Sequence, residues 1–338
     1  MVSIVVEGPH RLVVTDTQLT QPGPSEVAID LRRAGICGSD MHILHGTNPF
    51  ARYPRIIGHE MSGVVTAVGP RVLNCKPGDH VVVDPVVACG RCYPCKIGRP
   101  NVCAKLQVFG VHRDGGFRSS MVVPAANAIP VSADLSFARA ALAEPLSIAA
   151  NVLSRTGCGS EDVVLVYGAG TVGISVLQVA KMFGARCIVA DPDAARLERA
   201  RAFGADLTLR SDHDDIPAAV AGELDGLGPS VVIDGAGVPS LLAEMCRVAA
   251  PAGRIGLLCF SPEPTPVVQQ QIVSKELSLH GSRLNRRLMP QVIAWLETGK
   301  LQPDAMVTQT FAAADAKAAF AFIASHPEET VKVQLAFD

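Results

Sequence analysis

Four cysteines crowd into one short stretch of the chain, and thiolates at this spacing could hold a metal ion. Cys89, Cys92 and Cys95 form a C-x-x-C-x-x-C run, which Cys103 follows. Four thiolates can complete a tetrahedral shell around Zn²⁺ and leave no position for water, which makes a structural site. An iron–sulfur cluster and a group of free cysteines are the alternatives. We favour structural zinc because the spacing is specific, and such a site would pin a Gly- and Pro-rich loop that could not hold its shape alone.

The distribution of the cysteines argues against a secreted disulfide protein. The chain has 10 cysteines, and those outside the cluster are scattered. A secreted disulfide protein of this length would spread its pairs more evenly, and the first residues lack the basic start and apolar run of a secretory signal. A metal site is therefore the better account of the cluster, and a cytoplasmic protein is expected.

A second set of possible ligands is dispersed along the chain. Cys37 lies in a Gly-Ile-Cys-Gly-Ser-Asp segment, His59 and Glu60 follow Gly58, and Glu144 precedes a proline. A thiolate, an imidazole and two carboxylates are all reasonable zinc ligands, and three ligands plus a replaceable water make a catalytic site. Singly, each has a plainer explanation, such as a buried apolar cysteine or a structural histidine. The case rests on their joint occurrence.

A glycine motif predicts a dinucleotide site. Residues 168–173 read Gly-Ala-Gly-Thr-Val-Gly, after the apolar run Val163–Tyr167 and at the start of a helical pattern. In this context Gly168 permits the tight turn, Gly170 lets a pyrophosphate approach the backbone, and Gly173 lets helix and strand pack closely. The helix N-terminus offers free N–H groups to the phosphates. The expected cofactor contacts are Gly168, Gly170, Val172 and Gly173.

An acidic residue beyond these glycines favours NAD over NADP. Asp191 ends the next apolar strand, at the position where a carboxylate accepts the ribose 2′-hydroxyl and would repel a 2′-phosphate. Arg196 is a further cofactor candidate that would suit a 2′-phosphate. It lies a helical turn further on, where a solvated helix face is the plainer role. A simple tight turn is the alternative for the whole motif.

The surrounding pattern predicts two kinds of domain. Short β-branched runs at Val27–Leu31, Gly63–Val68, His80–Val83 and Met121–Val123, with Gly/Pro turns between them, suggest a barrel or sandwich. From Asp162 onward apolar strands alternate with helices, which indicates a parallel sheet covered on both faces. Strands are expected at Val163–Tyr167, Cys187–Ala190, Val231–Ile233 and Arg254–Cys259. Helices are expected at Val172–Phe183, Ala194–Phe203, Ser240–Val248 and Met289–Thr298.

Length, charge and hydropathy exclude several classes. The 338 residues suit two domains, and the 48% of hydrophobic residues suit a globular protein with a sizeable core. A formal net charge of -2 provides no general attraction for nucleic acid or an anionic membrane. The uncharged stretch Val163–Ala180 contains three glycines, so a strand, turn and helix start explain it better than a membrane span.

The whole chain resembles a zinc-dependent medium-chain dehydrogenase. The Gly-His-Glu motif, the four-cysteine cluster and the glycine motif carry this resemblance. It implies an α/β fold, with a GroES-like β-barrel catalytic domain and a Rossmann domain that has a doubly wound parallel sheet. The expected bounds are 1–145 for the catalytic domain, with a zinc lobe at about 84–106, then 146–284 for the Rossmann domain and 285–338 for the return.

The resemblance also implies roles for the dispersed ligands. It makes Cys37 and His59 catalytic zinc ligands, with Asp40 orienting the histidine. The third ligand stays open, because polyol dehydrogenases of the sorbitol or L-iditol type share the Glu-Pro at Glu144, and in them the glutamate of Gly-His-Glu can also ligate. Glu60 and Glu144 are therefore both candidates. One catalytic and one structural zinc per chain are expected.

Three further roles follow from the same resemblance. Ser39 matches a hydroxyl that takes the substrate proton, and His42 matches an outer histidine that passes it, by way of the cofactor ribose, to solvent. Ser39 could instead cap a helix starting at Asp40, with His42 exposed on that helix. Phe50 and Arg283 are expected at the substrate, where Arg283 could clamp a carboxylate or could form a salt bridge between the domains.

These expectations define one function and its alternatives. The chain is expected to oxidise a secondary alcohol of a polyol or sugar acid with NAD⁺ and to form a homodimer or homotetramer. Within the family the closest likeness is to sugar-acid enzymes of the L-galactonate 5-dehydrogenase type, carried by residues 48–50, 53–55 and 110–117. An L-threonine or simple alcohol dehydrogenase is one alternative, and a non-catalytic nucleotide-binding protein is another.

Overall fold

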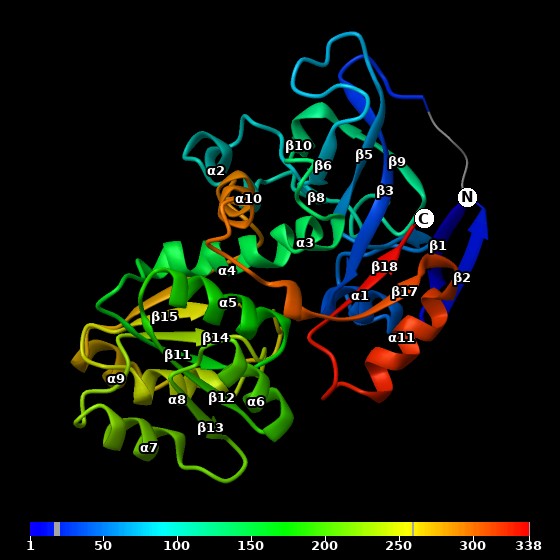
Figure 1. Cartoon of the computed structure of the whole chain (residues 1–338). Helices are drawn as coiled ribbons and strands as arrows, with labels where there is room; N and C mark the ends of the chain where they lie inside the picture. Colours follow the sequence, from blue (N-terminus) through cyan, green and yellow to red (C-terminus); the bar gives the residue numbers. More distant parts are fainter. Residues whose placement is uncertain (17–20, 259, 338) are drawn as a thin grey trace. The chain divides into compact units, whose positions relative to one another are not determined.

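The described residues form two compact units. A computed structural model describes residues 1–16, 21–258 and 260–337. One unit contains Met1–Glu144 and Asn285–Asp338, and the other contains Pro145–Leu284. Figure 1 shows the strands of the first unit in blue to green-cyan and in orange to red, and the sheet of the second in green and yellow.

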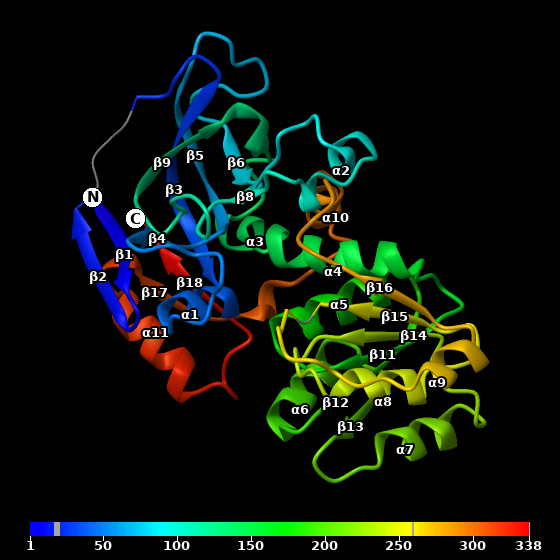
Figure 2. The ribbon, with the colours of Figure 1, turned by 180° about the vertical axis from the view of Figure 1, so that it is seen from behind.

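The main sheet of the first unit contains, among the described residues, seven strands. Its order is β10-β6-β5-β3-β18-β17, and β9 also pairs with β3. Figure 2 shows β9 and β5 beside β3. The strands are β3 (Glu26–Ile36), β5 (Glu60–Val68), β6 (His80–Val83), β9 (Ser120–Pro124), β10 (Ala128–Pro130), β17 (Val307–Ala312) and β18 (Lys332–Ala336). The runs expected as strands in the first third of the sequence lie within this sheet, because their β-branched side chains pack on its buried face.

The C-terminal strand explains why the end of the chain belongs to the first unit. β18 pairs antiparallel with β3, with Val333 opposite Ile36 and Leu335 opposite Ala34. Val333 and Leu335 point into the same apolar core as Ile29. Helix α11 (Ala316–Ser325) contacts β17 and β18 and adds its buried Phe320 to that core.

Smaller elements complete this unit. A three-stranded sheet joins β2 (Arg11–Asp16), β1 (Val2–Gly8) and β4 (Arg55–Ile56), and a two-stranded sheet joins β7 (Val86–Val87) and β8 (Gln107–Val108). The helices are α1 (Gly38–Leu44), α2 (Tyr93–Lys96), α3 (Phe137–Ala141), α10 (Met289–Glu297) and the 3₁₀ turns η1 (Pro100–Val102), η2 (Ala125–Asn127), η3 (Asp304–Met306) and η4 (Ala313–Asp315). Helix α4 (Ala143–Thr156) starts with the last two residues of the segment Met1–Glu144, and its other residues belong to the second unit.

The second unit contains a parallel sheet in the order β13-β12-β11-β14-β15-β16. The strands are β11 (Val163–Tyr167), β12 (Arg186–Asp191), β13 (Leu207–Arg210), β14 (Val231–Asp234), β15 (Arg254–Leu257) and β16 (Ser278–Gly281). The strand order reverses at β11, which pairs with β12 on one side and with β14 on the other. In open parallel sheets, ligands bind beyond the carboxyl ends of the strands at such a point.

Helices connect and cover these strands. They are α5 (Thr171–Met182), α6 (Ala194–Ala202), α7 (Ile216–Glu223), α8 (Leu241–Val248) and α9 (Gln269–Ser274). Leu165 and Ile188 on the sheet pack with Val220 of α7 and Met245 of α8 in one buried cluster. The expected alternation of strands and helices from Asp162 onward is confirmed. Cys259, the expected end of one strand, lies outside the described residues.

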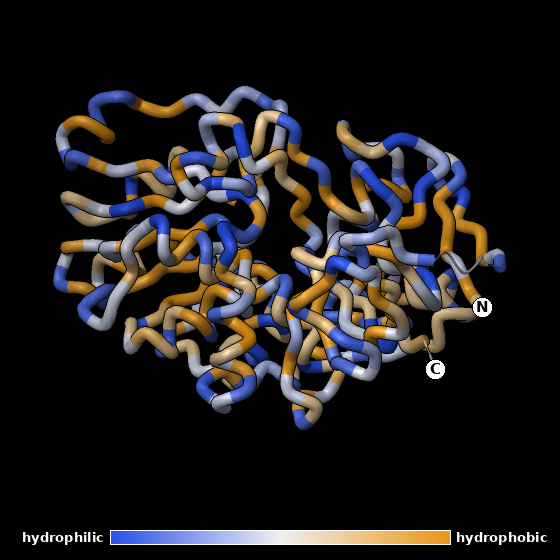
Figure 3. Tube along the Cα trace, turned by 90° about the horizontal axis from the view of Figure 1, so that it is seen from above, coloured by the Kyte–Doolittle hydropathy of each residue, from blue (hydrophilic) through white to orange (hydrophobic). Residues whose placement is uncertain are grey.

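The apolar stretch around residues 163–180 does not form a membrane-spanning helix. Its residues form β11, a glycine turn and α5 instead. Among the described residues, no helix is long and apolar enough to cross a bilayer. Figure 3 shows hydrophilic residues interrupting the hydrophobic segments along the trace.

Candidate functional site

Asp40 holds two distant turns of the first unit together. Its Oδ2 accepts a hydrogen bond from the Cys37 N–H at 2.9 Å, and its Oδ1 accepts one from the Gly58 N–H at 3.1 Å. Asp40 is 0% exposed, so both bonds are protected from water. Cys37 precedes the first turn of α1, and Gly58 leads into β5, so this carboxylate fixes the spacing between Cys37 and the residues after Gly58.

Three of the four dispersed ligands expected from the sequence come together. The Cys37 Sγ, a His59 ring nitrogen and a Glu60 carboxylate oxygen all lie within 4.8 Å of one another. His59 and Glu60 are buried, and within the described residues Glu60 Oε2 has no hydrogen-bond partner. A buried carboxylate oxygen without a partner is costly unless a cation or donor meets it. The donor set of thiolate, imidazole and carboxylate therefore fits Zn²⁺.

The surroundings of His59 favour a positive charge. Asp40 Oδ1 lies 3.7 Å from His59 Nδ1, so the carboxylate faces this edge of the ring. Burial by itself lowers the pKa of His59, but Asp40 and Cys37 outweigh it and raise the pKa well above its ordinary value. A bound cation would take the place of that proton, and Asp40 would orient the ring, as is common for metal-bound histidines.

Glu60 is paired with a lysine from the other end of the chain. Lys332 Nζ donates to Glu60 Oε1 at 2.6 Å and to the Ile36 carbonyl at 3.1 Å. Lys332 begins β18, and the pairing of β18 with β3 brings this lysine next to Glu60. Burial by itself lowers the pKa of Lys332, but the carboxylate of Glu60 and the other acidic groups around it outweigh this and raise the pKa. One oxygen of Glu60 is thus occupied by Lys332, while the other is left for a metal.

Glu144 lies near this cluster without joining it. It is 3% exposed at the start of α4, and it is absent from the group of atoms that lie within 4.8 Å of one another. Burial raises the pKa of Glu144 to about 7, and the charges of His59, Glu60 and Lys332 act on it as well. Of the two carboxylates expected at the metal, Glu60 is therefore the one that the geometry favours as a direct ligand.

Ser39 and His42 lie one turn apart on α1. Ser39 Oγ is 3.5 Å from His59 Nε2. His42 is exposed, and its Nδ1 is 3.0 Å from Thr47 Oγ1. Helix α1 begins at Gly38 with Cys37 as its N-cap, so the alternative of Ser39 capping a helix that starts at Asp40 is wrong. Residues three apart share a helix face, and the helix therefore connects the buried cluster with the surface.

The four clustered cysteines also converge. The Sγ atoms of Cys89, Cys92, Cys95 and Cys103 lie within 4.8 Å of one another. Backbone N–H groups of Cys89 and Lys105 each donate to Cys103 Sγ at 3.3 Å. The Ala104 N–H is the main cause that lowers the pKa of Cys92 to about 6. Amide donors directed at sulfur stabilise thiolates, so the loop fits a tetrahedral zinc ion.

The glycine motif forms a tight turn after β11 in the second unit. Gly168 has a φ of +93°, which favours glycine. A Cβ on Gly173 would lie 1.8 Å from the Gly168 carbonyl oxygen, whereas one on Gly170 would meet nothing within 4 Å. Gly170 is the N-cap of α5, and Val172 lies in the first turn of that helix. The turn therefore leaves open space at a helix N-terminus, which fits the pyrophosphate of a dinucleotide.

Asp191 closes this turn. Its Oδ2 accepts a hydrogen bond from the Ala169 N–H at 2.7 Å, and its Oδ1 accepts one from the Asp193 N–H at 2.8 Å. The side chain is 3% exposed. A carboxylate has about four acceptor positions, so these two bonds leave others for a ribose hydroxyl. Arg196 lies in the first turn of α6, where its N–H donates to Asp193 Oδ1 at 2.9 Å.

Comparison with known proteins agrees with both units. Residues 23–133 match the model for the alcohol dehydrogenase GroES-like domain, and residues 171–298 match the model for zinc-binding dehydrogenases. The starvation-sensing protein RspB of Escherichia coli K12 is 46% identical over 316 residues, which are 92% of each chain. The chain belongs to the zinc-dependent medium-chain dehydrogenase family. The expected fold class, a GroES-like domain plus a Rossmann-type parallel sheet, is confirmed.

Other members of the family show the range of known relatives. The L-galactonate-5-dehydrogenase of Escherichia coli K12 is 32% identical over 309 residues, which are 91% of each chain. The L-threonine 3-dehydrogenase of Pyrococcus furiosus is 34% identical over 321 residues, or 92% of this chain and 91% of that one. A crystal structure of RspB from Escherichia coli CFT073, described as a short chain alcohol dehydrogenase complexed with NADH, has a TM-score of 0.96 and 43% identity, covering 100% of this chain and 99% of that one.

The two residues expected at the substrate lie in different units of this dehydrogenase. Phe50 follows α1, is 38% exposed, and has its ring centroid 5.7 Å from that of His112. Arg283 follows β16, and its guanidinium carbon lies 5.5 Å from the centre of the Phe260 ring. Burial lowers the pKa of Arg283. Its proposed role as a carboxylate clamp stays a prediction.

Sequence reasoning missed Lys332, the residue that faces Glu60. No motif contains it, and a lysine at the start of a strand is usually exposed. The alternation of Lys332, Val333 and Gln334 gives no sign that all three are buried. Its role depends on the pairing of β18 with β3, which the sequence alone does not indicate.

Proposed function

We propose that this zinc-type alcohol dehydrogenase transfers a hydride from a secondary alcohol of a polyol or sugar acid to NAD⁺ and leaves a ketone. The observation that carries the proposal is the convergence of Cys37, His59 and Glu60 within 4.8 Å of one another. This donor set occurs in a chain that also has an open glycine turn at a helix N-terminus. The L-galactonate-5-dehydrogenase relative supports a sugar acid as the substrate.

Each chain would hold two zinc ions. Cys37, His59 and Glu60 would hold the catalytic ion, with Glu144 nearby, and the four-cysteine loop would hold the structural one. Zinc at the first site supplies a positive charge that lowers the pKa of an alcohol hydroxyl by several units. Three protein ligands leave a position for the substrate, whereas four thiolates close the shell.

The residues of α1 would carry the proton away from the reaction. Ser39, beside His59, would accept the proton of the substrate hydroxyl through its Oγ and give up its own hydroxyl proton toward His42, by way of the cofactor ribose. His42, one helical turn further and exposed, delivers a proton to solvent. The alcohol would thus lose one proton by way of Ser39 and His42, and bound NAD⁺ would supply the hydride acceptor that the two-electron oxidation to a ketone needs.

NAD⁺ is the proposed cofactor because of Asp191. A buried carboxylate beside the glycine turn would accept a hydrogen bond from the ribose 2′-hydroxyl and repel a 2′-phosphate. Arg196 stays a candidate for a further contact to the ribose.

One screen tests the proposal. The zinc-loaded protein is incubated with NAD⁺ and, separately, with hexitols, aldonates, L-threonine and simple secondary alcohols, while NADH absorbance is followed. Turnover of a polyol or aldonate is expected. Turnover of L-threonine alone, or of simple alcohols alone, would contradict the proposed substrate class. L-threonine is included in the screen because an L-threonine 3-dehydrogenase is among the relatives.

The metal content separates an enzyme from a nucleotide-binding protein on the same fold. Two zinc ions per chain are expected for the enzyme. A count of one, with no turnover in the screen, would favour the non-catalytic protein. A homodimer or homotetramer in the cytoplasm is proposed as the working form of the enzyme.

A further inference from the structure

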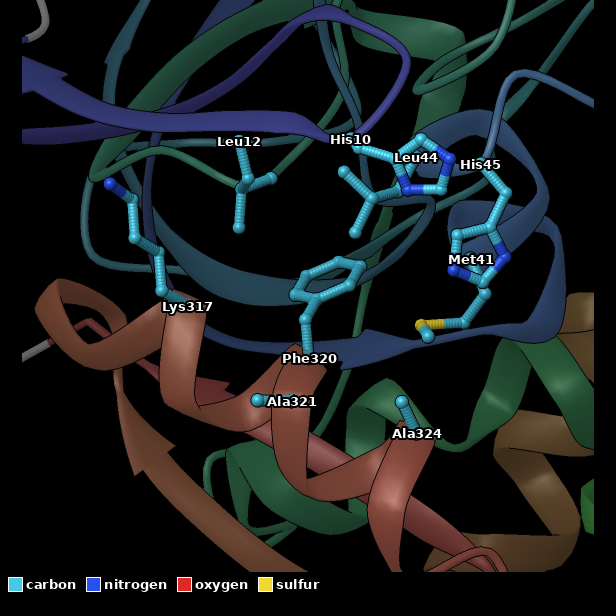
Figure 4. Close-up of a pocket in the computed structure, with 9 residues that line it drawn as sticks. All are labelled: His10, Leu12, Met41, Leu44, His45, Lys317, Phe320, Ala321 and Ala324. Carbon is cyan, nitrogen blue, oxygen red and sulfur yellow. The ribbon is translucent and has the colours of Figure 1, made fainter.

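Two hollows of different character occur in the described part of the first unit. One has a volume of about 360 Å³ and lies between the β1–β2 hairpin, α1 and α11. Figure 4 shows Leu12, Leu44, Met41 and Phe320 around it, with Lys317 at one end. The other has a volume of about 640 Å³, within the range of small-molecule sites. Its lining is cationic.

The second hollow, which we call the cationic pocket, is defined by residues 49–52, Arg55, 105–107 and His112. It contains the side chains of Arg52, Arg55 and Lys105, and none of the described residues that line it is acidic. A concave surface with charges of one sign raises the local concentration of ligands of the opposite sign.

The charges of this pocket are not neutralised equally. Arg55 donates to Asp114 Oδ1 at 2.8 Å, so its charge is largely balanced. Arg52 and Lys105 are exposed and form no ion pair with any carboxylate among the described residues. The Lys105 backbone is held in place by its bond to Cys103 Sγ at 3.3 Å. Arg52 and Lys105 can therefore both bind an anion, one from each of two separate segments that line the pocket.

The segments that line the pocket are bonded to the segments that carry the residues of the catalytic cluster. On one side, Asn48 donates its N–H to the His42 carbonyl at 3.2 Å, and Asn48 Oδ1 accepts from the Phe50 N–H at 2.9 Å. On the other side, Arg55 is four residues before His59. The segment beyond His112 is bonded to the residues after Arg55, with the Gly116 N–H donating to the Gly58 carbonyl at 2.9 Å. These backbone bonds tie the segments that line the pocket to the segments that carry His42 and His59.

We propose that the cationic pocket binds the anionic end group of the substrate through Lys105 and Arg52, so that the enzyme acts on sugar-derived acids rather than on neutral polyols. This inference rests on the proposed function. It assigns recognition of the anionic end group to two cations of the first unit, in addition to any contribution of Arg283. A carboxylate or a phosphate would satisfy the same two cations. The Phe50 ring, packed against His112, gives an apolar wall for the carbon chain.

Relative rates on matched substrates test the proposal. The kcat/KM for hexonates is divided by the kcat/KM for hexitols of the same stereochemical series, in the zinc-loaded enzyme with NAD⁺. This ratio is expected to fall about tenfold in Lys105→Ala and in Arg52→Ala, which is the size of one lost charge-assisted contact. Lys317→Ala, which removes a lysine from the other hollow, is the matched control and should leave the ratio within about twofold of the wild type. Hexitol phosphates are measured in parallel, and a larger effect on them than on hexonates identifies the end group as phosphate.

Direct binding separates this inference from the proposed function. Hexonate binding to the zinc-loaded protein is measured by calorimetry, with and without NADH, whether or not any substrate turns over. Binding that weakens about tenfold in Lys105→Ala supports the pocket even if the enzyme oxidises another alcohol. The inference is overturned if neither hexonates nor hexitol phosphates bind, or if the two variants bind them as the wild type does.

Discussion

Lys332 Nζ lies 2.6 Å from Glu60 Oε1, with the two side chains 0% and 1% exposed, in a unit where Glu60 Oε2 has no partner among the described residues. Two charges buried at this depth are stable when both are present, and removing one leaves the other uncompensated. Lys332 therefore holds one oxygen of Glu60 by a direct contact, and Glu60 also offers an oxygen to the group formed with Cys37 and His59.

Lys332→Met should destabilise the metal-free protein by about 3–5 kcal/mol, the cost of leaving a buried charge unpaired. Zinc bound beside Glu60 would supply a replacement charge, so the loss should be smaller in the zinc-loaded protein. Denaturant unfolding of both forms measures the two differences.

Two further variants separate the charge from the packing. Lys332→Arg keeps the charge and should lose less than Lys332→Met. The double variant Lys332→Met with Glu60→Gln removes both charges and should recover part of the stability. If the double variant is as unstable as the sum of the single ones, the pair does not act through its charges.

Glu60→Gln should remove about one zinc ion per chain, because an amide is a weaker ligand than a carboxylate and Glu60 belongs to the group of atoms within 4.8 Å. Glu144→Gln should leave the zinc content nearer to two, since Glu144 lies outside that group. Metal analysis after dialysis against a weak chelator gives the counts. The reverse ranking would make Glu144 the direct ligand.

Some residues of the catalytic cluster could be predicted from the sequence, and others could not. The Cys37 and His59 pair was predictable from the joint occurrence of several possible ligands and from the resemblance to the family, although each residue alone is a weak signal. The choice between Glu60 and Glu144 was not, since it depends on a few ångströms that only the packing of β5 and α4 determines. Lys332 was unpredictable for a stronger reason, because it reaches Glu60 through strand pairing across almost the whole chain.

The fold likewise has elements that could be predicted from the sequence and others that could not. The β11–turn–α5 unit was predictable from the glycines and from the apolar run before them. The pairing of β18 with β3 was not predictable from residue patterns, because an apolar strand can pair at many edges. The resemblance to the family supplied that long-range information, in the expected return of 285–338 to the catalytic domain.

Zinc binding at Cys37, His59 and Glu60 should weaken as the pH falls. Burial raises the pKa of Glu144 to about 7, and Asp40 and Cys37 overcome burial to raise the pKa of His59 well above its ordinary value. His59 thus holds its proton in the metal-free protein near neutral pH, and Glu144 holds a proton in part of the molecules. They contribute stability that is fully present below their ordinary pKa values and that falls as the pH rises through the raised ones.

Zinc must displace the His59 proton and favours the loss of the Glu144 proton. Calorimetry in buffers of different ionisation enthalpy counts the protons released per zinc ion. Below about pH 7, Glu144→Gln should release about one proton fewer than the wild type. Proton release that does not change with pH or with this variant would contradict the prediction.

Asp191→Ser should weaken the preference for NAD⁺ over NADP⁺, because it removes the carboxylate that would repel a 2′-phosphate. Asp191 also closes the glycine turn through Ala169 and Asp193, so the variant could lose binding of both cofactors. Asp191→Asn is the control, because its amide oxygen keeps one of these bonds while the charge is lost. The ratio of kcat/KM for the two cofactors should fall in both variants, and an unchanged ratio would refute the assignment.

Ser39→Ala should lower kcat by about 10²–10⁴-fold, the usual contribution of a positioned proton-transfer group. Ser39 Oγ lies 3.5 Å from His59 Nε2, so its hydroxyl is beside the proposed zinc site, and alanine provides no group to take the substrate proton. Ser39→Thr keeps the hydroxyl and should retain most of the activity. Without Ser39, bases in solution must take the substrate proton, and these bases are more abundant at higher pH. The decrease in kcat caused by Ser39→Ala should therefore become smaller as the pH rises. Zinc content must stay at the wild-type level in both variants. Wild-type turnover in Ser39→Ala would remove this residue from the mechanism and leave His42 without a proton donor on α1.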